Sequence, residues 1–276
     1  MPHLQRLADV SVLAFVVSSM LAMGMSQRLG DVVASLKEPR TVLLALIVNF
    51  VLSPLLTVAL IRAVPLQPAH ATGLLLLGSA AGAPFLPKLA ELSGGHLAYS
   101  VALMMLLMVG SVVFMPLALL LIVPGVEADP WRIAKPLLLM LLPMAIGFAL
   151  ARSAWAARLL GFVQRVSNLA FVLLVVLLVG LNLKTMTGFV GSFAIGTFAV
   201  YVLGMVAIGH LLGGADRSKR TVFALGAGSR NIPAALVVAG TSFSDPVITV
   251  MVLVGAVTGL VLLLVLAKAM RGKVSA

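Results

Sequence analysis

Long apolar runs alternate with short polar segments along almost the whole chain. A helix needs about 20 predominantly apolar residues to cross the hydrocarbon core of a bilayer, and windows of that length recur along the sequence. Segments rich in proline, glycine or charge, such as residues 37–40 and 213–216, separate the windows and have the composition of loops. The pattern predicts nine membrane-spanning helices, at residues 9–25, 41–61, 71–90, 97–122, 131–151, 162–183, 189–212, 220–239 and 246–269.

The composition points to the same class of protein. Of the 276 residues, 62% are hydrophobic and 10% are charged, and the mean hydropathy is +1.19. The apolar share of a soluble globular domain is about one half, so the sequence predicts an all-α polytopic membrane protein in a lipid bilayer. The chain contains no cysteine, which excludes disulfides, thiolate metal ligands and a cysteine nucleophile.

The net charge of +11 is explained by membrane topology and does not indicate nucleic-acid binding. Basic residues gather in short clusters between the predicted spans, and such clusters favour the cytoplasmic side of a membrane. If the chain crosses the membrane nine times, the larger group of basic residues lies on one side: Arg28, Lys37, Arg40, Arg152, Arg158, Arg165, Arg217, Lys219, Arg220, Lys268, Arg271 and Lys273. The smaller group on the other side is Arg6, Arg62, Arg132, Lys135 and Lys184. The asymmetry predicts a plasma (inner) membrane protein with its N-terminus outside and its C-terminus in the cytoplasm.

Two stretches of the same design interrupt the third and the eighth predicted spans. Residues 82–87 and 228–233 each begin with glycine and end with an aliphatic residue followed by proline. Glycine loosens the backbone and proline removes a hydrogen-bond donor, so both stretches should break a helix near the middle of the bilayer. Such breaks are tolerated where protein or a water-filled cavity satisfies the freed backbone groups. Paired breaks in two halves of a chain indicate the binding site of a secondary transporter.

The positions of the breaks predict an inverted repeat within a single transmembrane transporter domain, residues 1–276. The broken spans are five crossings apart, so the halves that contain them, residues 9–122 and 131–270, should have opposite orientations in the membrane. Pro87 and Pro233 fit the first turn of each second half-helix, where a missing N–H is harmless. The two half-helix N-termini should meet near the centre, each with roughly +0.5 of an elementary charge.

Arg230 and Lys88 lie in or directly after the breaks and add full positive charges to this centre. All the carboxylates lie at span ends or in loops, so a small organic anion is predicted to complete the site. The planar arginine fork suits a carboxylate, a sulfate or a phosphonate, and Asn231 is in position to cap a half-helix. Two structural alternatives remain open: Arg230 could donate to carbonyls left free near Ala227, and Lys88 could pair with Glu91.

Several short motifs resemble those of a known transporter family. They are Met23-Gly24-Met25 in the first span, Asn49-Phe50 followed by Pro54 in the second, the two crossings, and Gly-Ser-Arg-Asn at residues 228–231. On these residues nearly the whole chain is similar to the bile acid:sodium symporter superfamily in its shorter, nine-span form. The resemblance implies a panel domain and a core domain, two crossed discontinuous helices in the core, and a substrate cavity between the domains.

The sequence departs from the family pattern at the first crossing. Ala83 and Pro84 stand where a serine and an asparagine are typical, and neither offers a side-chain oxygen. Met104 replaces a hydroxyl residue one turn beyond Ser100 in the following helix.

A second departure lies at the other crossing, where Gly226 and Arg230 stand in place of an acidic residue and a glutamine. The polar positions that remain are Ser100, Asn231 and Asn49, the last where glutamine is typical. Hard cations need several oxygen ligands, usually with a carboxylate among them. Both sodium sites implied by the resemblance are therefore expected to be dismantled.

These observations together predict a secondary active transporter of a small organic anion that works by alternating access, without sodium, a cofactor, a bound metal or enzymatic activity. Two alternatives remain: a sodium-coupled organic anion symporter that uses backbone carbonyls and Ser100, and a signalling or scaffold membrane protein without transport. The candidate substrate-binding residues are Arg230, Asn231, Ser229, Pro84, Lys88 and Asn49. The candidate remnants of ion sites are Ser100, Asn49 and Asn231.

Overall fold

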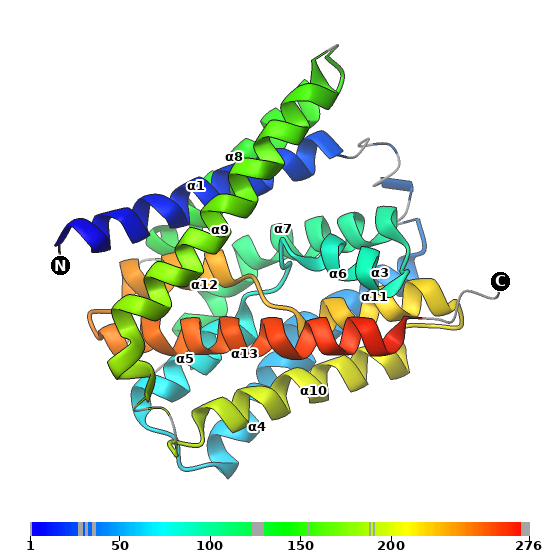
Figure 1. The fold of residues 1–276 in the computed structure, drawn as a ribbon. Helices are drawn as coiled ribbons and strands as arrows, with labels where there is room; N and C mark the ends of the chain where they lie inside the picture. Colours follow the sequence, from blue (N-terminus) through cyan, green and yellow to red (C-terminus); the bar gives the residue numbers. More distant parts are fainter. Residues whose placement is uncertain are drawn as a thin grey trace.

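Every regular element in the described part of the chain is a helix (Figure 1). The structure is a computed structural model, and it describes residues 2–26, 30, 33–34, 37–122, 130–153, 155–187, 189 and 191–271. In chain order the helices are α1 (Pro2–Ser26), α3 (Pro39–Ile47), the π-helical segment η1 (Val48–Leu52), α4 (Ser53–Ala63), α5 (Pro68–Ser79), α6 (Leu86–Ser93), α7 (Leu97–Ile122), α8 (Pro130–Leu150), α9 (Ala156–Thr187), α10 (Ala194–Leu212), α11 (Arg217–Gly228), α12 (Ile232–Ser242) and α13 (Pro246–Met270). The prediction of an all-α membrane protein is confirmed.

The helices coincide with the predicted spans. Within the described residues, six stretches are long and apolar enough to cross a membrane: Pro39–Ala63, Leu97–Leu119, Ala156–Leu173, Ala194–Leu212, Arg217–Ser242 and Pro246–Met270. The first and fifth predicted spans correspond to α1 and α8, which contain shorter apolar stretches, Leu13–Ser26 and Leu141–Leu150. The third span is divided between α5 and α6. The predicted loop at Pro124 lies outside the described residues, as do Arg28 and Lys273.

The two discontinuous helices cross at their breaks. Residues 80–85 separate α5 from α6, and residues 229–231 separate α11 from α12. The backbone N–H of Asn231 donates to the carbonyl of Ala80 over 2.8 Å, so the breaks are in direct contact. Because α5 packs on α12 while α6 packs on α11, each half-helix meets the opposite half of the other span. The crossing predicted from the sequence is therefore present.

Local chemistry explains why the helices stop and restart here. Gly82 has a φ of +81°, in the left-handed region, and an added Cβ would collide with the backbone of Met108 in α7. Glycine is therefore required at this position. Pro87 and Pro233 lie in the first turns of α6 and α12, as expected. Asn231 caps α12, because its side-chain oxygen accepts a hydrogen bond from that helix's backbone over 3.1 Å.

Helix α1 packs against both α8 and α9. In Figure 1, α1 lies above the crossed helices, whereas α9 runs from the upper right of the view to the lower left. The backbones of α1 and α8 touch. A Cβ added to Gly24 would collide with the carbonyl of Met144, and one added to Gly147 would collide with the carbonyl of Leu21. Small residues allow membrane helices to approach this closely, and α9 packs on the same α1 helix.

The contact between α1 and α8 gives a first prediction. Gly24→Val forces a branched side chain between two touching backbones, and overpacking of this kind costs about 1–3 kcal/mol or more. We expect a lower melting temperature of the purified protein in detergent. Gly180→Val in α9 is the matched control, because no atom lies within 4 Å of a Cβ added there. Equal melting temperatures for the two variants would contradict the packing described for α1.

Candidate functional site

Arg230 is the centre of a buried polar network at the crossing. Only 4% of its surface is exposed. Its Nη1 donates to the hydroxyl of Ser53 over 3.2 Å, and its Nη2 donates to Oδ1 of Asn49 over 2.9 Å and to the carbonyl of Ala227. The guanidinium also lies 5.7 Å from the centre of the Tyr201 ring, in cation–π contact. The Nε has no hydrogen-bond partner among the described residues.

Ser53 connects this network to the neighbouring helices. Its Oγ lies 2.6 Å from the carbonyl of Gly78 and 2.6 Å from the hydroxyl of Tyr201. A hydroxyl has one proton to donate and two lone pairs to accept with. Since the carbonyl can only accept, Ser53 donates to Gly78 and accepts from Tyr201 and Arg230. Every hydrogen-bonding position of Ser53 is then occupied, and one side chain joins α4, α5, α10 and the second break.

The second span is shaped to present these partners. Pro54 has no N–H, and a proline ring clashes with the carbonyl four residues earlier, here that of Phe50. The helix widens into the π-helical η1 directly before it, a feature that often marks functional sites. Asn49 lies in this segment, and its Nδ2 donates to the carbonyl of Ala45 over 3.0 Å. This bond leaves the amide oxygen of Asn49 facing Arg230.

A different residue, Ser111 of α7, holds the first break. Its Oγ lies 3.0 Å from both the backbone nitrogen and the carbonyl oxygen of Ala81. A single hydroxyl thus accepts from the peptide N–H and donates to the carbonyl of a residue that has left the helix. Ser111 is 1% exposed, so no solvent is needed to satisfy these freed backbone groups.

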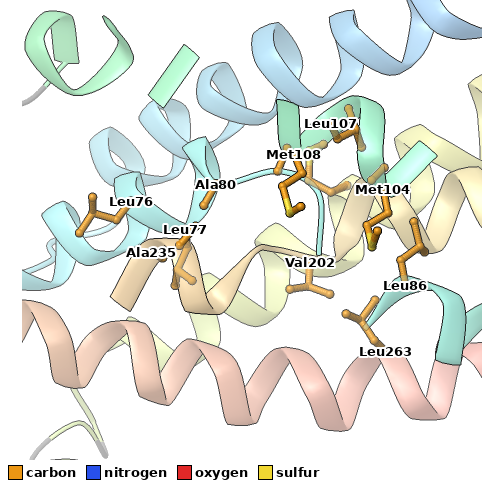
Figure 2. Packing of buried hydrophobic residues seen from close by; sticks show 14 of the residues in the cluster. Leu76, Leu77, Ala80, Leu86, Met104, Leu107, Met108, Val202, Ala235 and Leu263 are labelled. Carbon is orange, nitrogen blue, oxygen red and sulfur yellow. The ribbon is translucent and has the colours of Figure 1, made fainter. Parts of the chain in front are cut away.

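Apolar side chains fill the surroundings of Gly226. A Cβ added there would meet Leu103 at 3.0 Å and Leu86 at 3.2 Å. Met104 is also fully buried, and Figure 2 shows Leu86 and Met104 among the buried hydrophobic residues between α6 and α7. The position where the family pattern has an acidic residue is thus enclosed by leucine.

Ser100, the predicted remnant of an ion site, makes a bond within its own helix. Its hydroxyl donates to the carbonyl of Leu97 over 2.6 Å. In the described part of the chain, no group of three or more His, Asp or Glu side chains could hold a metal ion.

A cavity of about 770 Å³ separates α1 and α9 from the crossed helices and α13. This volume lies within the range of small-molecule sites, about 300–1,000 Å³. The cavity extends to Ser26 at the end of α1 and to Leu92 near the end of α6. The topology predicted from the basic residues would place both of these helix ends on the cytoplasmic side of the membrane.

The cavity brings together some of the predicted site residues and not others. Its lining includes Pro84, Lys88, Ser229 and Arg230. The other three predicted residues, Asn49, Asn231 and Ser100, do not line it and are at most 1% exposed.

The two structural contacts that the sequence left open are both formed. Arg230 donates to the carbonyl of Ala227. Lys88 Nζ lies 2.8 Å from a carboxylate oxygen of Glu91, and their side chains are 55% and 62% exposed. Lys88 and Glu91 are therefore the exposed charges of the cavity wall, and they form a pair, while Arg230 is directed into its own network.

Sequence reasoning missed two groups of residues. The first comprises Ser53, Tyr201 and Ser111, hydroxyls in otherwise apolar spans that gave no signal of their own. The second is a face of α9 formed by Gln164, Ser167 and Asn168, which lines the cavity opposite the crossing. Their spacing of three and four residues is a signal of one helix face, and it was available in the sequence.

The family model described as the Sodium Bile acid symporter family matches residues 13–189. The matched range contains the first break, and it ends before Tyr201 and the second break. No curated protein matches the chain.

The connection made by Ser53 gives a second prediction. Ser53→Ala removes the partner of the Gly78 carbonyl, of the Tyr201 hydroxyl and of one Arg230 N–H, and each buried group left unpaired costs about 1–3 kcal/mol. We expect a clear fall in melting temperature. Ser100→Ala is the control, because Ser100 is equally buried but donates only within its own helix. If both variants melt at the same temperature, Ser53 does not connect the network.

Proposed function

Because the chain belongs to the sodium bile acid symporter family, we propose that it is a secondary active transporter of a small organic anion that works by alternating access without sodium. The family consists of membrane transporters and not enzymes, which gives the general class. The observation that carries the finer proposal is the hydrogen-bonded guanidinium of Arg230 at the crossing. In this proposal the arginine replaces a coupling cation with a charge that belongs to the chain.

Two features support the proposed sodium independence: the fixed positive charge of Arg230 and the engagement of the neighbouring oxygens. A sodium ion about 4 Å from a guanidinium would be repelled by about 4 kcal/mol at an effective dielectric constant of 20, which lowers its occupancy about a thousandfold. The oxygens of Asn49, Ser53 and Ala227 already accept from Arg230. The leucines around Gly226 offer no further oxygen.

The substrate anion is proposed to bind on the cavity side of the same crossing. Ser229 and Pro84 line the cavity there, next to the N-terminus of α12, whose dipole is favourable for an anion. Lys88 supplies an accessible full charge. Its exposed pair with Glu91 contributes at most about 1 kcal/mol, so a bound carboxylate can displace Glu91 at small cost. Arg230 then stabilises the anion through its field, without leaving its network.

Alternating access is proposed as movement of the α1, α8 and α9 group against the crossed helices. The cavity lies between these two bodies and extends toward the side predicted to be cytoplasmic. All residues of the buried Arg230 network lie outside α1, α8 and α9, in η1, α4, α5, α10, α11 and the second break. Its hydrogen bonds can therefore stay intact while the cavity opens to either side. The proposed location is the plasma membrane, with the N-terminus outside.

The test is uptake into liposomes that contain the purified protein. Cholate, benzoate and 3-phenylpropanoate are first compared for their ability to raise its melting temperature, and the labelled acid that binds is then used for uptake. We expect equal uptake in sodium, potassium and choline buffers. Accumulation driven by a sodium gradient would establish a sodium symporter instead. Uptake of none of the acids would favour the scaffold alternative.

Two variants test the roles of the cationic residues in this uptake. Arg230→Gln is expected to abolish uptake while the protein stays in the membrane, because charge-assisted hydrogen bonds worth about 1.5–3 kcal/mol each are lost at the crossing. Lys88→Gln should give the milder loss, with weaker binding as the main effect, since Lys88 is already paired with Glu91. Unchanged uptake by Arg230→Gln would remove the arginine from the mechanism.

A further inference from the structure

The polar face of α9 takes no part in the hydrogen-bond network of Arg230 or in the ion pair of Lys88 with Glu91. Gln164, Ser167 and Asn168 line the cavity, and Phe171 continues the same face one turn further along the helix. Gln164 and Asn168 are exposed, whereas Ser167 is 8% exposed. None of the three polar side chains has a hydrogen-bond partner within the described ranges of the chain. Three unpaired polar groups therefore face the cavity from one helix.

Polar side chains within membrane spans usually face other helices or a functional cavity. Gln164 and Asn168 each offer two donors and two acceptor lone pairs, and Ser167 adds a hydroxyl. All three are uncharged. The face is therefore suited to hydroxyl, carbonyl or amide groups and makes no contribution to charge selection.

The remainder of the α9 face is aromatic. The centre of the Phe171 ring lies 5.1 Å from that of Phe15 in α1 and 6.5 Å from that of Phe85 in the first break. The rings of Phe85 and Phe171 are stacked at an interplanar angle of 17°. These three rings line the cavity and lie near the middle of their spans. Gln164 lies two turns closer to the first residue of α9, Ala156. Along α9 the lining of the cavity thus changes from hydrogen-bonding side chains to an aromatic cluster.

We propose that Gln164, Ser167 and Asn168 form a hydrogen-bonding subsite that selects organic anions carrying an additional uncharged polar group. The apolar body of such a substrate packs on Phe15, Phe85 and Phe171, and its hydroxyl, carbonyl or amide group binds the amides of α9. This inference rests on the proposed function, and it assigns discrimination for the uncharged polar part of the substrate to three residues of α9.

The experiment compares pairs of acids that differ in hydroxyl groups. The pairs are 3-phenylpropanoate with 3-(4-hydroxyphenyl)propanoate, and 5β-cholanate with cholate. Their affinities are measured by thermal stabilisation of the purified full-length protein and of the variants Gln164→Leu and Asn168→Leu. Gln67→Leu is the matched control, because Gln67 is exposed at the start of α5 and does not line the cavity.

In at least one pair, we expect the hydroxylated acid to bind about fivefold to tenfold more tightly than the acid without hydroxyls. This preference should be seen in both the unmodified protein and Gln67→Leu, and its size corresponds to about one net hydrogen bond. This preference should fall below about twofold in Gln164→Leu or Asn168→Leu, while the affinity for the acid without hydroxyls stays the same. Both variants should melt like the control without ligand, because leucine is tolerated on a membrane helix.

Equal binding of both members of each pair, or a preference that survives in both leucine variants, would overturn the subsite while leaving the proposed function in place. Binding of none of the four acids to any of the proteins would count against both the subsite and the transport of organic anions. The two failures are therefore distinguishable.

Discussion

The structure depends on one constraint, a guanidinium enclosed in the interior of a membrane protein. Removal of an ion from water costs several kcal/mol even after the surroundings relax, and arginine does not lose its proton to escape that cost. Asn49, Ser53, the carbonyl of Ala227 and the ring of Tyr201 supply the compensation. These groups come from three separate spans of the chain, so the charge can be accommodated only when the crossing is assembled.

This constraint divides the molecule into two mechanical parts. The hydroxyl of Ser53 uses its full hydrogen-bonding capacity to join α4, α5, α10 and the second break. Ser111 fixes the first break to α7. The close backbone contact at Gly24 joins α1 to α8 in the other part. The cavity lies between the two, where side chains and not backbone hydrogen bonds make the contact. Movement at that boundary leaves the buried charge satisfied.

Local chemistry could be predicted from the sequence, and partner choice could not. The breaks, the first-turn positions of Pro87 and Pro233 and the cap at Asn231 follow from residue types within a few positions of each other, and all are present. The sequence also offered Ala227 and Glu91 as partners, since both lie within one helical turn of their cations. Ser53 and Tyr201 were missed because their roles arise only when distant spans pack together.

The central claim is that the Arg230 guanidinium occupies the place of a cation at the crossing. The most direct test is to measure the melting temperature of Arg230→Ala while millimolar guanidinium is added. The controls are the unmodified protein and Arg62→Ala, which removes an exposed arginine at the end of α4. We expect the Arg230 variant to melt at a lower temperature and to be stabilised saturably by guanidinium, with no such effect in the controls. Unchanged stability of Arg230→Ala, or an identical response of all three proteins to guanidinium, would contradict this account.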